Sequence, residues 1–502
     1  MECKYVTNRV LNIFSFFHRF RWAFCQLEVL RHCLPPGVRG ILDELPETLD
    51  ETYERVLKNI NKSNQKHAIR LLHCLIVAIR PLRVEELAEV LAVDFDAAQQ
   101  GGIPKLNPNW RWADQHQAVL STCSSLIAIV DYGNYQVVQF SHFSVKEYLT
   151  SDRLANASGN ISRYYILPEP AHTILAQACL GVLLRLDDHV NDDNAKDMPL
   201  ANYAARHWVG HAQFKGVSSR IQDAMEYFFD ADKPHYAVWL RLYDIDAKVF
   251  SISPDINISQ GEPLYYASIC GFYNLAKHLA VKHPEHINAR GGRAGSPLGG
   301  ALLQNYFQVV ELLHERGADI HIRGLRERTP LHFASRLGSV DGVRWLLNHG
   351  ADANAQQDDH WTPLHLAIYN RRLEIVQMLL EHNADIHAQT DRGEVALHLA
   401  ACPKFNSLSD RIQNHILLLL LDGTTDVNTR DNEGSTPLHL SSFRRGDKCC
   451  ISTTGTVAGT RLLLEHGASL YAVNNKGETP LQVALGAEHG EMVEYLQGLV
   501  TK

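Results

Sequence analysis

The sequence predicts a mainly α-helical protein, in which a stack of repeated helix pairs follows a small helical domain with one β-hairpin and a helical connector. Short, nearly identical segments recur in the second half of the chain, and three of them, at 329–334, 362–367 and 395–400, are 33 residues apart. Recurrence at a fixed period of this length is typical of solenoids, whose units pack only against their neighbours. In the first half, apolar residues recur at helical spacing before two strand-like segments.

Each repeat is expected to contain two helices. In the unit 357–389, Thr362 is placed to cap a helix, and Pro363 occupies its first turn, where a missing N–H costs no hydrogen bond. The apolar residues over 373–380 predict a second helix. Asn383 stands just after that helix, where other units have glycine, because both residues tolerate a left-handed conformation.

This motif and its period resemble the ankyrin repeat, and about seven units are expected over 255–502. The clearest units are 324–356, 357–389, 390–430, 431–473 and 474–502. The residues that carry the signature are Thr329, Pro330, His332, Thr362, Pro363, His365, His398, Thr436, Pro437, His439, Thr479 and Pro480. The resemblance implies that the histidine makes a structural hydrogen bond between repeats. Extra residues near 402–411 and 444–457 are expected to form longer loops.

Residues 45–150 are expected to form a winged-helix domain, because three helices precede a hairpin. The expected helices cover 49–60, 68–79 and 84–91, and the expected strands cover 126–130 and 135–140. Pro81 ends the second helix, whose buried face is expected to include Ile79. Residues 131–134 form the turn. Residues 151–254 are expected to form a helical connector.

Acidic residues argue against nucleic-acid binding by this domain. The third helix would be the reading helix, and it carries Glu85, Glu86 and Glu89, whose carboxylates would repel phosphates. The formal net charge of −8 points the same way. The apolar run at 10–17 is shorter than the roughly 20 residues that span a bilayer, so no membrane association is expected.

Five segments of the first half, taken in order, resemble segments of a known protein family. They are 20–28, 45–57, 81–88, 141–149 and 199–208. They resemble the region that follows the nucleotide-binding NACHT domain in fungal STAND or NLR-like signalling NTPases. The resemblance implies that residues 1–44 are a helical remnant following a NACHT-like region. No GxxxxGK[ST] loop, which would cradle nucleotide phosphates, occurs in the chain.

No enzymatic, cofactor or metal site is expected from the sequence. Four of the 27 histidines, at 332, 365, 398 and 439, occupy the repeat position, and no histidine pair has cysteine partners at the spacing of a zinc site. No GxSxG nucleophile motif occurs. The ten cysteines form no CxxC pair, which is typical of reduced thiols in an intracellular protein, in the cytoplasm or the nucleus.

Positions that vary between otherwise constant repeat residues are expected to contact a partner. Arginine, tryptophan and tyrosine are the side chains most often found at interface hot spots. Arg326, Arg328, Trp361 and Tyr369 are therefore expected to form the core of a protein-binding patch on the concave surface. The wider candidate set adds Arg336, Asp358, Asp359, Arg392 and Phe443.

The function expected from these observations is non-catalytic protein–protein interaction, as a scaffold or as the sensing or regulatory arm of an NLR-like system. The partner is a protein of unknown identity, with self-association or association with a NACHT-type NTPase as further expectations. One alternative is a truncated signalling NTPase whose P-loop domain is missing from this chain. Another is a regulatory chain that acts in trans on a NACHT protein.

Overall fold

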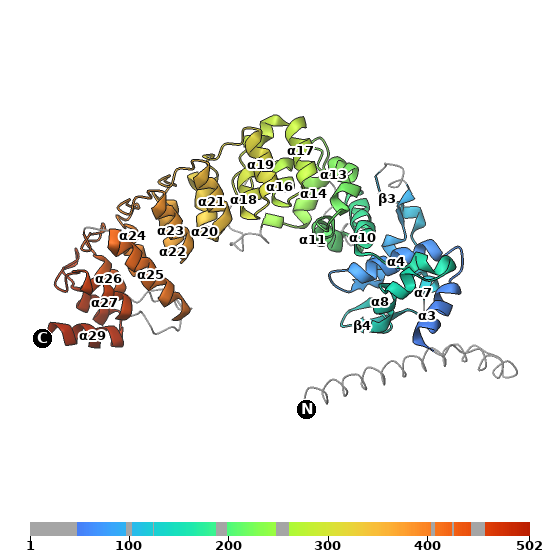
Figure 1. Ribbon diagram of the computed structural model, residues 1–502, viewed down its shortest axis with the longest axis horizontal. Coiled ribbons are helices and arrows are strands. Elements are labelled where there is room, and N and C mark those ends of the chain that lie inside the picture. The colour runs from blue at the N-terminus through green and yellow to red at the C-terminus, as the bar shows by residue number, and fades with distance from the viewer. Residues whose placement is uncertain are drawn as a thin grey trace, which may run out of the picture. The chain divides into compact units, whose positions relative to one another are not determined.

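The structure is a computed structural model (Figure 1). It describes residues 48–96, 103–123, 125–186, 198–246, 261–402, 407–423, 426–442 and 457–501. The chain divides into two compact units, 1–248 and 249–502, each considered by itself. Both are mainly helical, which confirms the predicted fold class. The helical remnant predicted for 1–44 lies outside the described residues.

The first unit begins with three helices and a small sheet that form the winged helix. The helices are α3 (Leu49–Lys58), α4 (Gln65–Val77) and α5 (Val84–Val90), and the hairpin strands are β4 (Ile127–Tyr132) and β5 (Tyr135–Phe140). A short strand, β1 (Leu82–Arg83), pairs antiparallel with β5, so the strand order is β1-β5-β4. The hairpin loop contains only two residues, because Tyr132 pairs with Tyr135 and Gly133 supplies the positive φ of 64° that such a tight loop requires.

One predicted core position of this domain is wrong. Ile79 is 57% exposed, whereas the helical pattern placed it on the buried face of α4. The helix ends at Val77, and Ala78 adopts an extended conformation with ψ of 132°. The chain therefore leaves the helix ahead of Arg80 and Pro81, since proline disfavours a helical residue before it.

Smaller elements complete the domain, and a helical layer follows it. The smaller elements are β2 (Val93–Asp94), β3 (Lys105–Leu106), η2 (Pro108–Trp110), α7 (Gln115–Cys123), α8 (Phe143–Leu149), α9 (Asp152–Ala155) and η3 (Gly159–Tyr164). The following helices are α10 (Pro168–Leu183), α11 (Ala201–Ala212), α12 (Val217–Arg220), α13 (Gln222–Phe228) and α14 (His235–Leu242). Helix α10 packs against both α4 and α11. Four buried aromatic rings, those of Trp208, Phe228, Phe229 and Trp239, pack together in the core of this layer.

The second unit is a stack of helix pairs (Figure 1). The described pairs are α16 (Pro263–Ile269) with α17 (Tyr273–Lys282), α18 (Pro297–Leu303) with α19 (Phe307–Glu315), α20 (Pro330–Leu337) with α21 (Val340–Asn348), α22 (Pro363–Tyr369) with α23 (Leu373–Glu381), α24 (Ala396–Ala401) with α25 (Ser407–Gly423), α26 (Pro437–Ser442) with α27 (Val457–Glu465), and α28 (Pro480–Gly486) with α29 (Gly490–Val500). Two short 3-10 turns, η5 (Pro284–Asn288) and η6 (Leu325–Glu327), lie between pairs. First helices pack on first helices along the stack, and second helices pack on second helices from α21 to α29 and between α17 and α19.

The local signals at the helix ends act as the sequence predicted. Thr362 caps α22, because its hydroxyl accepts a hydrogen bond from the backbone N–H of His365 at 3.4 Å, and Pro363 opens the helix. Asn383 has a φ of 60° directly after α23, the left-handed conformation expected there. These contacts set the register of each helix pair against the preceding turn.

The insertion near 402–411 is helical in part, which corrects the expectation of a loop. Helix α25 has 17 residues, whereas α23 has 9, and the additional residues lie at its N-terminal end. The buried amide of Gln413 donates to the carbonyl oxygen of Ala400 at 2.9 Å, which ties the lengthened helix to the end of α24. Residues 443–456, which contain most of the other predicted insertion, lie outside the described residues.

Candidate protein-binding surface

Stacking arranges the candidate residues into columns, because equivalent positions in successive units are 33 residues apart. The hairpin-tip column contains Arg326, Asp359 and Arg392. The column just before the first helix of each unit contains Arg328 and Trp361. The column at the end of the first helix contains Arg336 and Tyr369. The last two columns converge on the first helices α20 and α22, which pack against each other. Phe443 lies outside the described residues.

The hairpin tips are joined to one another by backbone hydrogen bonds. The N–H of Asp358 donates to the carbonyl oxygen of Arg326 at 3.2 Å, and the N–H of Asp391 donates to that of Asp359 at the same distance. The N–H of Asn432 continues the series to the carbonyl oxygen of Arg392 at 2.9 Å. The tips therefore present their side chains from an ordered edge.

An ion pair links two residues of the tip column. Nη2 of Arg326 lies 2.5 Å from Oδ2 of Asp359, and both side chains are nearly half exposed. Arg326 also has a φ of 59°, so its backbone is held in the left-handed region. An exposed pair of this kind contributes only about 0–1 kcal/mol. A partner could displace it at little cost in folding stability.

Two arginines behind the tips are partly buried and close to each other. Nε of Arg328 donates to Oε1 of Gln357 at 2.8 Å, and the guanidinium lies over the ring of Phe333. Burial, together with the neighbouring charges of Arg336 and Arg326, lowers the pKa of Arg328 to about 10. Burial also lowers the pKa of Arg336, whose buried Nε has no hydrogen-bond partner among the described residues.

The next unit places an aromatic pair at the corresponding positions. The rings of Trp361 and Tyr369 meet edge to face, with centroids 5.3 Å apart and an interplanar angle of 80°. Tyr369 is 40% exposed, and Trp361 is partly exposed. The first-helix side of the units 324–356 and 357–389 therefore offers two desolvated cations beside two aromatic rings. We call Arg328, Arg336, Trp361 and Tyr369 the arginine–aromatic patch.

The repeat histidines are structural groups. His332, His398 and His439 are buried, and each Nε2 bonds a backbone carbonyl of the next unit: Trp361 at 3.0 Å, Ser435 at 3.1 Å and Glu478 at 3.0 Å. This is the contact between repeats that the ankyrin resemblance implied. His365 is also buried, and its Nδ1 accepts from the N–H of Thr362 at 3.1 Å.

An asparagine clamp between units was not predicted from the sequence. The side chain of Asn354 donates to the carbonyl oxygen of Asn383 at 3.1 Å and accepts from the N–H of Asp385 at 2.7 Å. Asn288 and Asn428 make the same two bonds with their following units. The sequence pattern that could have predicted this clamp is the recurrence of asparagine at the same position before the repeat signature.

The acidic third helix of the winged helix also differs from expectation. Glu86 and Glu89 are buried, so their carboxylates do not face a ligand. Glu86 binds Arg80 through two hydrogen bonds, of 2.8 and 2.6 Å, and Glu89 pairs with Arg111. Of the three residues expected to repel phosphates, only Glu85 is partly exposed.

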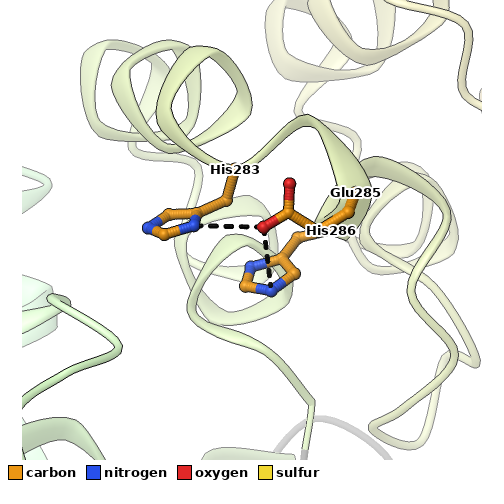
Figure 2. Close-up of side chains that lie close together, drawn as sticks. All are labelled: His283, Glu285 and His286. Atoms are coloured by element: carbon orange, nitrogen blue, oxygen red, sulfur yellow. Dashed lines mark hydrogen bonds and ion pairs between the residues drawn. The ribbon is translucent and has the colours of Figure 1, made fainter.

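A further cluster of polar side chains lies at the first repeat. His283, Glu285 and His286 come together in the turn after α17, as Figure 2 shows, and they offer the types of atom that bind metal ions. No metal site was expected from the sequence. Among the described helices, none is both long and apolar enough to cross a membrane.

Comparisons with known proteins agree with this architecture. The family model described as ankyrin repeats (3 copies) matches residues 298–390 and 397–499. The model described as the GPI inositol-deacylase winged helix domain matches residues 53–159. Ankyrin repeats and a winged helix domain of that type are therefore present, and ankyrin repeats are non-catalytic units that favour an interaction role.

One curated relative extends the comparison. The chain is 31% identical over 298 residues to "Azaphilone pigments biosynthesis cluster protein L" of Monascus ruber. The match covers 56% of this chain and 61% of that protein. The chain thus matches less than two thirds of the length of this relative.

Proposed function

We propose that this chain is a non-catalytic interaction protein that binds a protein partner through the arginine–aromatic patch. The repeats 324–356 and 357–389 supply the binding side chains, and the hairpin tips that carry Arg326, Asp358, Asp359 and Arg392 form its rim. In this proposal, the winged-helix domain at 45–150 and the helical connector at 151–254 precede the solenoid, which begins near 255, and take no part in the binding surface.

The observation that carries the proposal is the electrostatic state of Arg328 and Arg336. Burial disfavours both charges and lowers both pKa values, and the neighbouring charge of Arg336 lowers the pKa of Arg328 further. A carboxylate from a partner would offset that cost by pairing with the partly exposed guanidinium of Arg336. The adjacent rings of Trp361 and Tyr369 suit an apolar side chain of the same partner.

The partner segment that fits this chemistry is acidic with an apolar or aromatic residue nearby. We place the protein inside the cell, and we assign it neither a nucleic-acid nor a membrane partner. Its role is that of a scaffold or of the sensing or regulatory arm of an NLR-like system. The resemblance of residues 20–250 to the region after a NACHT domain supports that context.

Two related roles use the same surface. In one, the chain regulates a separate NACHT protein in trans. In the other, it is part of a signalling NTPase whose P-loop domain is not in this sequence. Nucleotide hydrolysis by the purified 502-residue chain would contradict the non-catalytic proposal.

The test combines affinity capture with paired substitutions. A partner captured by the full chain is titrated against the wild type, against Arg336→Ala with Trp361→Ala, and against Arg344→Ala with Trp345→Ala. The second pair is a matched control, because Arg344 and Trp345 lie on the second helix α21. Loss of a central hot spot typically costs about 2 kcal/mol or more, so we expect at least a roughly 30-fold weaker dissociation constant for the first pair only.

The proposal fails if the first pair binds the partner as tightly as the wild type. It also fails if both pairs weaken binding equally. Circular dichroism of each variant separates loss of binding from loss of folding.

A further inference from the structure

The turn after α17 has a geometry that places two imidazoles side by side. His283 follows the last residue of the helix, and Pro284 opens the 3-10 turn η5. Residues three apart eclipse each other in a 3-10 turn. The N–H of His286 bonds the carbonyl oxygen of His283 at 3.0 Å, and the two rings stack with centroids 5.0 Å apart and an interplanar angle of 15°.

The carboxylate of Glu285 lies against both rings, as Figure 2 shows. Its Oε1 is 3.2 Å from Nδ1 of His283 and 3.8 Å from Nε2 of His286. The three candidate ligand atoms lie within 4.8 Å of one another. Glu262, the N-cap residue of α16, brings a second carboxylate, whose Oε2 is also 3.8 Å from Nε2 of His286.

We propose that His283, Glu285 and His286 form a binding site for a divalent transition-metal ion, of which Zn²⁺ is the best match. Imidazole nitrogen and carboxylate oxygen are both zinc ligands. Zinc bonds to these atoms are about 2.0–2.2 Å long, so ligand atoms around one tetrahedral ion lie about 3.3 Å apart. The separations of 3.2 and 3.8 Å are close to that value.

A metal-free cluster is the competing explanation, in which His286 interacts with both carboxylates through ion pairs alone. At 3.8 Å, its Nε2 is too far from either carboxylate for a hydrogen bond, although it faces both Glu285 and Glu262. An ion bonded to all three groups would bridge these separations. Glu262 is close enough to supply a fourth ligand after a small rotation of its side chain.

The site would act on the first helix pair of the solenoid. Glu262 precedes α16, and the two histidines follow α17, so a shared ion would join the two ends of this pair. A ligand that binds only the folded state stabilises it in proportion to the logarithm of its concentration over its dissociation constant. We therefore expect zinc to order this end of the repeat stack.

The test compares zinc binding by full-length variants at equal free Zn²⁺ under reducing conditions. His283→Gln with His286→Gln removes both imidazoles. His321→Gln with His387→Gln is the matched control, because these histidines are exposed, follow the second helices α19 and α23 of other units, and lie outside the proposed site. Equilibrium dialysis gives the number of ions bound, and hydrogen–deuterium exchange over 273–288 reports the site itself.

We expect the first variant to bind one zinc ion fewer than the wild type and the control to bind the same number. Even outer-shell partners of a metal are worth about 10- to 100-fold in affinity, so loss of the two ligands should weaken this site by roughly 100-fold or more. Glu285→Gln, at an exposed position, should weaken it as well. Equal stoichiometry in all chains, or no zinc-dependent protection over 273–288 in the wild type, would overturn the proposal.

Discussion

The imidazole of His332 joins its own unit to the carbonyl oxygen of Trp361 in the next, 3.0 Å from Nε2. Nδ1 of the same ring accepts the backbone N–H of Thr329 at 3.2 Å. Since Nδ1 must be unprotonated to accept this bond, Nε2 carries the hydrogen and donates it to Trp361. One neutral tautomer thus caps a helix and connects two units. A second proton on the ring would break the cap.

We predict that the solenoid loses stability as the pH falls below 6.5. Burial lowers the pKa of His332 and of His365 from 6.5 to about 4. Between these values the unfolded chain binds protons that the folded chain does not, so the free energy of unfolding decreases with decreasing pH. Each histidine should account for a loss on the order of 3 kcal/mol by pH 4. Urea unfolding at several pH values measures this loss.

The variant His332→Gln tests the cause. In the last unit Gln482 occupies the histidine position, and its Oε1 accepts the N–H of Thr479 at 2.8 Å, so glutamine preserves the cap without titrating. The variant should lose less stability than the wild type between pH 6.5 and pH 4. An identical pH profile would show that His332 is not a source of the acid sensitivity.

We predict that Asn354→Ala lowers the free energy of unfolding by about 1 kcal/mol. The substitution removes two hydrogen bonds to the following unit, but water can replace part of them because the clamp is exposed. His321 is the control, since it occupies the equivalent exposed position with an imidazole in place of the amide. His321→Ala should change stability by less than about 0.5 kcal/mol. Chemical denaturation measures the free energy of unfolding of both variants. An equal decrease in the two would contradict the structural role of the clamp.

We predict that Glu86→Ala destabilises the winged helix by about 2 kcal/mol, because it removes charge-assisted hydrogen bonds from Arg80 and from the Arg83 N–H, while the remaining Arg80 side chain, 38% exposed, is partly solvated. Although burial alone would raise the pKa of Glu86, the hydrogen bonds from Arg80 and from the Arg83 N–H outweigh it and lower that pKa. The carboxylate is therefore ionised and paired at neutral pH.

Glu85→Ala is the matched control for this prediction. Glu85 lies one residue earlier on α5 and is partly exposed, so its substitution should cost less than about 0.5 kcal/mol. Thermal unfolding of both variants gives the comparison. A loss at Glu85 as large as that at Glu86 would mean that the acidic charge in the first turn of α5, and not the buried pair, causes the effect.

Local rules explain why much of the fold could be predicted. Capping by Thr362, the proline at the first turn and the left-handed Asn383 depend on residues within one unit, and the 33-residue recurrence shows how units stack. The patch residues could be selected because they interrupt an otherwise constant pattern. The asparagine clamp shows that a recurrent polar residue can also be structural.

The errors lie where distant segments meet. Nothing near Glu89 in the sequence shows that it is buried, because Arg111 and the N–H of Leu200, 2.7 Å from Glu89, come from later elements. The extended α25 likewise depends on the contact between Gln413 and Ala400.

The sequence by itself determined the repeat architecture, the helix caps and the order of the two units' elements, because these depend on short-range periodicity and backbone preference. Only the tertiary structure decided which polar groups are buried, paired or brought together. Arg328 and Arg336 share one desolvated surface, and Glu262 approaches the His283–His286 turn, because stacking and chain reversal place separated residues within a few ångströms. Desolvation and charge at such distances determine the chemistry of a site, and sequence spacing does not report them.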